Sequence, residues 1–177
     1  MTNDRSNHDA LYEGAITAYG AALDRLARSY EADQEKRRDL LQEIHLALWQ
    51  SFGSFDSRCS LRTWIYRVAH NVATSHVIRD HRIYSRTLVG LEVLETLSAN
   101  DDQERAVDKQ TALAKLLKLI QQLKPLDRQV VLSYLEGLDA ASIAEITGIS
   151  PGNVATKIHR IKSILTRRFH KGESHGK

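Results

Sequence analysis

Residues 139–160 read DAASIAEITGISPGNVATKIHR, and this stretch contains two helix starts on either side of one tight turn. Asp139 can accept hydrogen bonds from the first N–H groups of a helix over 140–147, and Gly148 tolerates the left-handed backbone that ends such a helix. Ser150 can cap the next helix, whose first residue, Pro151, needs no amide hydrogen. The stretch therefore predicts a short helix, a turn and a second helix over 151–169, which is helix-turn-helix geometry.

The second of these helices has one apolar and one basic face. Val154, Ile158, Ile161 and Leu165 recur at steps of four, three and four, so we expect them to face the core. A recognition helix presents its outer face to the DNA major groove, while flanking cations hold phosphates. A solvated cationic face is the simpler alternative. The candidates for base edges are Asn153, Thr156 and His159, and those for phosphates are Lys157, Arg160 and Lys162.

Outward from this motif, the rest of the chain also predicts helices. Apolar residues recur at helical spacing over 11–30, 34–52, 61–82, 103–123 and 126–136, and Pro125 precedes the last of these. Residues 51–60 are rich in serine and read as a loop, after which Ser60 can cap the next helix. The inward side of that helix is expected to carry Leu61, Trp64, Ile65, Val68, Val72 and Val77.

We therefore expect an all-α fold of two small helical bundles. The first spans residues 1–86, the second residues 111–177, and the acidic and polar stretch 87–110 joins them as a linker. Hydrophobic residues make up 42% of the 177 residues and charged residues 27%, which is typical of a soluble globular protein.

Charge is distributed unevenly along the chain. Residues 51–86 hold six Arg against two Asp, a net +4, and residues 151–177 hold seven bases against one acid, a net +6. The remaining stretches, residues 1–50 and 87–150, carry net charges of −3 and −4. Two basic blocks in acidic surroundings indicate a protein that binds a polyanion at two points.

Other functional classes find little support. Cys59 is the single cysteine, so no disulfide can form within the chain. No apolar stretch approaches the roughly 18 residues that a membrane helix needs, and the first nine residues lack an apolar signal core. We expect a cytoplasmic protein without membrane insertion. His70, His76 and His81 share a predicted helix at spacings that do not align them, and no metal motif accompanies them, so we expect no metal, no cofactor and no catalysis.

Two further stretches resemble a known family. Residues 39–49, DLLQEIHLALW, resemble region 2.2 of sigma-70-family factors, which docks on the clamp helices of RNA polymerase. Residues 52–56, FGSFD, and 60–71, SLRTWIYRVAHN, are similar to the loop and helix with which the family opens the −10 promoter element. Residues 123–169 look like region 4, which reads the −35 element. The resemblance covers roughly residues 10–82 and 110–169, and the two-domain layout matches the extracytoplasmic-function (ECF) subfamily.

The resemblance implies a role for particular residues. It places Phe55 in the loop around a flipped base and Asn71 at that base's edge. Independently of the resemblance, aromatic residues at helical spacing usually belong to the core, so we expect Trp64 to lie mostly in the core and leave the role of Tyr66 open. Ala155 and His159 depart from the usual pattern and leave the −35 sequence undetermined. The implied cationic track consists of Arg58, Arg62, Arg67, Arg79 and Arg82, and the implied polymerase contacts are Asp39, Leu41, Gln42, Glu43, Leu46 and Trp49.

The sequence thus predicts a sigma factor whose partners are core RNA polymerase, promoter DNA and an anti-sigma factor. The alternative is a helix-turn-helix regulator that binds DNA without polymerase. The basic loop and helix of residues 51–86 favour the sigma factor, because a repressor needs no track for a single strand.

Overall fold

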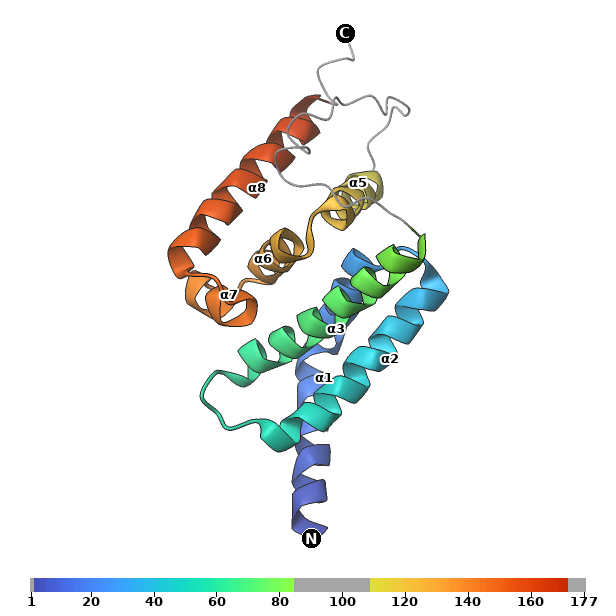
Figure 1. Cartoon of the computed structure of the whole chain (residues 1–177), viewed down its shortest axis with the longest axis vertical. Coiled ribbons are helices and arrows are strands. Elements are labelled where there is room, and N and C mark those ends of the chain that lie inside the picture. Colours follow the sequence, from blue (N-terminus) through green and yellow to red (C-terminus); the bar gives the residue numbers. More distant parts are fainter. Residues whose placement is uncertain (1, 85–108, 172–177) are drawn as a thin grey trace.

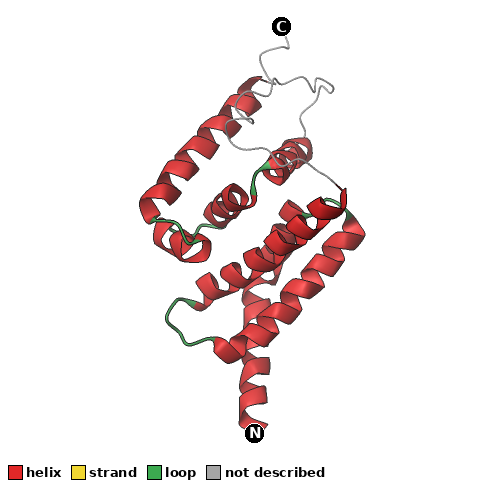
Figure 2. Ribbon diagram, viewed as in Figure 1, coloured by secondary structure: helices red, strands yellow, loops and turns green. Residues whose placement is uncertain are grey.

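The computed structural model describes residues 2–84 and 109–171, with side chains described within 8–79 and 112–167. Its regular elements are helical, which confirms the predicted all-α fold (Figures 1 and 2). The predicted linker lies outside the described residues, apart from its last two, which begin α5. The elements are α1 (Thr2–Tyr30), α2 (Gln34–Ser51), the 3-10 helix η1 (Phe52–Ser54), α3 (Leu61–Tyr84), α5 (Lys109–Gln122), α6 (Pro125–Leu135), α7 (Ala140–Thr147) and α8 (Pro151–Lys171).

Local capping explains where several of these helices begin. Asp33 accepts from the backbone N–H groups of Glu35 and Lys36 at the start of α2. The Ser60 hydroxyl accepts from the N–H of Thr63 at 3.0 Å at the start of α3. Side-chain oxygens satisfy N–H groups that have no partner within a helix, so these residues set the helix starts.

The helix-turn-helix forms as the sequence predicts. The Asp139 carboxylate accepts from the N–H of Ser142 at 2.8 Å, and the Ser150 hydroxyl accepts from the N–H of Asn153 at 3.3 Å. Gly148 ends α7 with φ at 75°, a left-handed conformation that glycine adopts without strain.

The N-terminal bundle packs α1, α2 and α3 around one apolar core. Leu40, Ile44 and Leu48 recur at steps of four on α2 and are fully buried. Helix α1 begins at Thr2, earlier than predicted, and the Trp49 indole N–H donates to the Asp9 carboxylate at 2.9 Å. This contact attaches the N-terminal half of α1 to the end of α2.

The C-terminal bundle consists of α5, α6, α7 and α8. Val154, Ile161 and Ile164 are buried on α8, and Ile158 and Leu165 pack partly buried beside them. Arg128 on α6 is almost completely buried, and its guanidinium donates to the carbonyls of Gln121 and Leu123 at the end of α5. Arg128 thereby satisfies carbonyl groups that would otherwise lack partners.

The two bundles pack against each other through α3. Helix α3 contacts α1 and α2 on one side and α6 and α7 on the other, and α1 also contacts α5 (Figure 1). Because helices cover α3 on two sides, its buried face differs from the prediction. Tyr66, Ala69, His70 and Ala73 are buried with Ile65, whereas Trp64 is only partly buried. Tyr66 is therefore the core aromatic residue of this helix.

Candidate nucleic-acid interface

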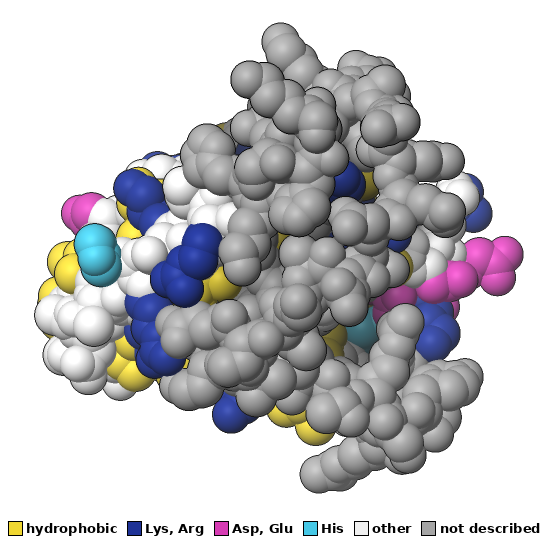
Figure 3. Space-filling view, turned by 90° about the horizontal axis from the view of Figure 1, so that it is seen from above, with side chains coloured by type: hydrophobic (Ala, Val, Ile, Leu, Met, Phe, Trp, Pro, Cys, Tyr) yellow, Lys and Arg dark blue, Asp and Glu magenta, His cyan; other side chains and the backbone are white. Residues whose placement is uncertain are grey.

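The outer face of α8 carries the side chains predicted to read bases. Asn153, Thr156 and His159 are exposed, and the Thr156 hydroxyl donates to the carbonyl of Gly152 at 3.0 Å. That bond leaves the lone pairs of the hydroxyl available to a ligand. In Figure 3, Lys and Arg side chains gather at the left of the view, on the side where α8 lies in Figure 1. The helix thus presents a polar and cationic surface opposite its buried stripe.

Two of the predicted phosphate-binding lysines already have partners within the fold. The Lys157 ammonium lies 2.6 Å from the Asp127 carboxylate, whose side chain is only 7% exposed. Lys162 is exposed, and its ammonium lies over the Tyr134 ring at 5.5 Å. Arg160 is partly buried on the same helix. A phosphate would therefore compete with a nearly buried carboxylate for Lys157, but only with an exposed aromatic ring for Lys162.

The loop before α3 is held by a small aromatic cluster. The centroid of the Phe55 ring lies 5.5 Å from that of the Trp64 ring, and the Arg67 guanidinium also stacks on Trp64, 4.8 Å from its ring centroid. The same guanidinium lies 3.7 Å from the Cys59 sulfur, which ties the loop to the helix. Arg58 projects into solvent and pairs with Asp56 at 2.5 Å. Phe55 and Arg67 thus both contact Trp64 at the start of α3, while Arg58 extends into solvent from the adjoining loop.

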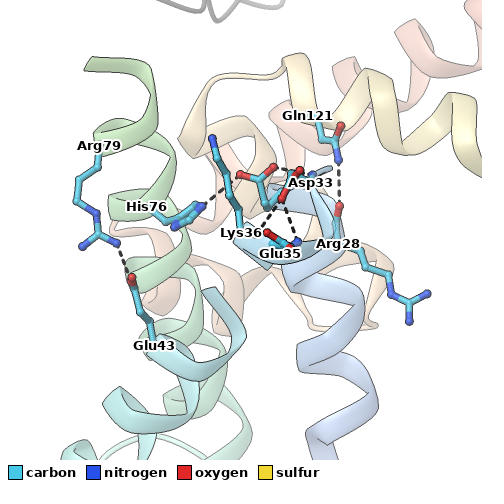
Figure 4. A network of polar contacts seen from close by, with 9 residues as sticks. Arg28, Asp33, Glu35, Lys36, Glu43, His76, Arg79 and Gln121 are labelled. Carbon is cyan, nitrogen blue, oxygen red and sulfur yellow. Dashed lines mark hydrogen bonds and ion pairs between the residues drawn. The ribbon is translucent and has the colours of Figure 1, made fainter. Parts of the chain in front are cut away.

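The other predicted residues of the track divide between different faces of α3. Asn71 is exposed one turn beyond Arg67, so these two share a face. Arg62 instead points to the C-terminal bundle, where its guanidinium donates to the carbonyl of Glu136. Arg79 pairs with Glu43 of α2 at 2.6 Å (Figure 4). The side chain of Arg82 lies outside the described residues.

The outer face of α2 contains the residues predicted to contact polymerase. Asp39 and Gln42 are exposed, and Leu46 is 57% exposed although it is a large apolar residue. Leu41, Glu43 and Trp49 lie partly buried at the margins of this face. The exposed pair of Glu43 with Arg79 is of the kind that contributes little to stability, so a partner can displace it.

Sequence reasoning missed a buried polar group between the bundles. His70 is fully buried; its Nδ1 lies 2.9 Å from the Tyr30 hydroxyl and its Nε2 lies 3.1 Å from the Ser133 hydroxyl. Burial lowers the pKa of His70 to about 3. Burial, followed by the nearby Glu136 carboxylate, raises the pKa of Tyr66 to about 12. The sequence did contain a signal of this second buried side: residues 62, 66, 70 and 74 recur once per turn, and they line the side of α3 that meets α6.

Figure 4 shows a further polar contact between the two bundles, near the ends of α1 and α5. The Gln121 amide donates to the carbonyl of Arg28 at 3.0 Å, while Glu31 lies 3.3 Å from His76 of α3. Within the described parts of the chain, no three His, Cys, Asp or Glu side chains are grouped closely enough to hold a metal ion. No helix there is long and apolar enough to cross a membrane.

Comparisons with known proteins agree with this division into two parts. The family model described as sigma-70 region 2 matches residues 15–83, and the model described as sigma-70, region 4 matches residues 113–165. The RNA polymerase sigma factor YlaC of Bacillus subtilis is 30% identical over 141 residues, which cover 77% of this chain and 79% of that protein. The ECF RNA polymerase sigma factor SigW of the same organism is 27% identical over 141 residues, or 74% of each chain.

Solved structures share the fold at lower sequence identity. CnrH, solved in complex with the cytosolic domain of CnrY, has a TM-score of 0.67 at 19% identity and covers 96% of this chain and 94% of its own. The sigma factor RpoE of Bartonella quintana, solved with the anti-sigma factor NepR, has a TM-score of 0.66 at 19% identity and covers 90% of this chain and 96% of its own.

The two family matches, together with the helix-turn-helix of α7 and α8, identify the chain as a transcription initiation factor. The chain belongs to the sigma-70 family of RNA polymerase sigma factors, and its relatives identify the ECF subfamily.

Proposed function

We propose that this chain is an ECF sigma factor in which three surfaces divide the work of promoter recognition. The exposed face of α2 docks on core RNA polymerase, the loop of residues 55–60 with α3 opens the −10 element, and α8 anchors the −35 element. The observation that carries the proposal is that one chain presents a capped, cationic recognition helix and a second cationic helix next to a loop whose Phe55 ring is partly buried against Trp64. A helix-turn-helix alone would serve any DNA-binding regulator.

The chemistry of the −10 surface suits single-stranded DNA. Phe55, Trp64 and Arg67 offer stacking surfaces, and stacking on aromatic rings and guanidinium planes replaces what a base loses on leaving the duplex. Asn71 is exposed on the same face as Arg67, and its amide can both donate to and accept from a base edge. Arg58 is 87% exposed and is available for the backbone of the strand.

Under this proposal the chain is a specificity subunit without an active site of its own, and it works in the cytoplasm with the polymerase. We also infer that an anti-sigma factor holds the free chain. Support comes from RpoE of Bartonella quintana, which was solved with the anti-sigma factor NepR.

In vitro transcription tests the proposal directly. Purified core polymerase is incubated with and without the chain on randomised promoter templates. We expect chain-dependent transcripts that share two upstream elements. If the chain instead fails to bind polymerase and binds one duplex sequence tightly alone, it is a helix-turn-helix regulator.

Two substitutions test the separate surfaces. Asn71→Ala should reduce promoter opening and spare polymerase binding, and equal loss of both would contradict the base-reading role. Arg160→Ala should weaken promoter affinity almost uniformly across sequences and flatten the salt dependence by about one. A changed sequence preference in that variant would contradict the phosphate role.

A further inference from the structure

The last residue of α2, Ser51, makes two hydrogen bonds through one hydroxyl group. The hydroxyl donates to the carbonyl of Leu48 at 2.9 Å, and its oxygen accepts from the Trp64 indole N–H at 3.0 Å. A hydroxyl has one proton to donate and an indole N–H can only donate, so each bond can run in one direction only. Ser51 therefore joins the end of α2 to the start of α3 by a hydrogen bond of fixed direction.

The Ser51 hydroxyl is held by the core rather than by the loop that follows it. Leu48 is fully buried, and its carbonyl also accepts from the backbone N–H of Phe52, a residue that is itself buried. The oxygen that receives the indole is therefore anchored to residues of the N-terminal core.

Trp64 in turn supports two residues that the proposed function assigns to DNA. The Phe55 ring packs against it with 5.5 Å between ring centroids, and the Arg67 guanidinium lies 4.8 Å from its centroid. Trp64 is only partly buried, and the second side-chain dihedral of a tryptophan has broad energy wells, so packing alone holds the ring loosely. The bond from the indole to Ser51 fixes the nitrogen end of the ring and with it the surface on which Phe55 and Arg67 lie.

A fixed Trp64 ring has a consequence for the capture of a base. Side chains that are already in their bound orientation lose less conformational entropy when a ligand arrives. If the ring were free to turn, Phe55 and Arg67 would lose their common support, and a flipped base would have to order all three side chains. Opening of the −10 element should therefore weaken without this bond, although no residue assigned to DNA is changed.

We propose that Ser51 is a positioning residue for promoter opening, which acts on the base-reading loop through the Trp64 indole. This inference rests on the proposed function. The hydroxyl orients the indole, and the oriented ring holds Phe55 and Arg67 where a flipped base meets them. Because Ser51 ends α2, the support for the loop comes from the helix that is proposed to dock on polymerase.

Indole N–H resonances test whether Ser51 holds Trp64. The chain contains two tryptophans, so the isotope-labelled full-length chain gives two indole N–H signals, which Trp64→Phe assigns. Ser51→Ala should shift the Trp64 signal and leave the signal of Trp49, which is bonded to Asp9, in place. Ser51→Thr keeps the hydroxyl and should preserve both signals. Ser54→Ala, at an exposed position of η1, is the matched control and should also preserve both. An unmoved Trp64 signal in Ser51→Ala would overturn the proposal.

Promoter opening by the holoenzyme tests what the bond does. Core polymerase is saturated with each variant chain, and the unpaired thymines of the −10 element are followed by their reactivity with permanganate. Ser51→Ala should reduce opening, and the affinity of the holoenzyme for a single-stranded −10 oligonucleotide, about fivefold, the factor that corresponds to one typical hydrogen bond. Binding to polymerase and to a duplex −35 element should be unchanged. Ser51→Thr should restore opening, and Ser54→Ala should behave as the wild type.

These measurements separate a positioning role from lost folding and from failure of the proposed function. If polymerase binding and −35 binding fall together with opening, and the urea midpoint falls too, Ser51 serves only stability and the proposal is wrong. It is also wrong if the Trp64 signal shifts without any loss of opening, or if Ser51→Thr fails as Ser51→Ala does. If the wild-type holoenzyme opens no promoter, the proposed function is wrong, and the indole signal still decides whether Ser51 holds Trp64.

Discussion

Acidification should weaken the folded structure through one buried side chain, His70. The ring is completely buried between α1 and α6, and burial lowers its pKa from 6.5 to about 3. Its contacts are the Tyr30 and Ser133 hydroxyls and the Tyr66 ring, none of which carries a charge at neutral pH. Two ionised groups touch those neighbours: Arg128 lies over the Tyr30 ring and Glu136 bonds to Tyr66.

The sign of the effect follows from proton binding. The buried ring stays neutral, but the unfolded chain protonates it as the pH falls below 6.5, so the unfolded state binds more protons. The contribution of His70 to stability is therefore complete above pH 6.5 and is lost progressively as the pH falls from 6.5 towards 3. At pH 5 the loss covers about 1.5 pH units at 1.36 kcal/mol each, or about 2 kcal/mol.

Urea unfolding at pH 7 and pH 5, followed by circular dichroism, measures this loss. His70→Gln keeps a polar side chain without the titration, and His159→Gln serves as the control because His159 is exposed. With a urea slope of about 2 kcal/mol/M, acidification should lower the wild-type midpoint by about 1 M more than that of His70→Gln. The His159→Gln variant should follow the wild type. An equal fall for wild type and His70→Gln would refute the burial argument.

Three further substitutions test single contacts through urea unfolding. Arg128→Lys should cost about 2 kcal/mol, because one ammonium cannot serve two carbonyls and stack on a ring; an unchanged midpoint would contradict this role. Lys157→Met should destabilise the chain by about 3 kcal/mol, because it leaves the Asp127 carboxylate unpaired. It should not alter the salt dependence of DNA binding. If the slope of log affinity against log salt falls by about one, Lys157 contacts a phosphate instead. Gly148→Ala should cost about 1 kcal/mol of stability from its left-handed backbone alone, since an added methyl group meets no atom within 4 Å. The control, Gly152→Ala in α8, should be neutral or stabilising. Equal effects of the two substitutions would argue against backbone strain.

Much of the local structure could be predicted because its causes lie within a few residues. Asp139, Gly148 and Ser150 act on N–H groups or dihedral angles nearby, so the bounds of α7 and the start of α8 follow directly from the sequence. The exposed faces of α8 and α2 could also be predicted, since helical periodicity places Val154 and Leu40 inside and their neighbours outside.

The side of α3 that meets α6 could not be predicted in this way. Periodicity indicated one buried stripe, but α3 is covered on two sides, and the second stripe is polar and aromatic. Arg62 and Arg67 looked equivalent as members of a cationic track. In the fold Arg67 stacks on Trp64, whereas Arg62 reaches Glu136, which is 74 residues away in the chain.

The sequence by itself determined the helices, their caps, the helix-turn-helix and the family, because these depend on neighbouring residues and on motifs that can be read in order. Tertiary structure alone decided the environment of His70, the partner of Lys157 and the position of Glu136. These depend on which helices meet and in what register. The physical reason is that a polar side chain looks the same in sequence whether water or a distant part of the chain satisfies its hydrogen bonds.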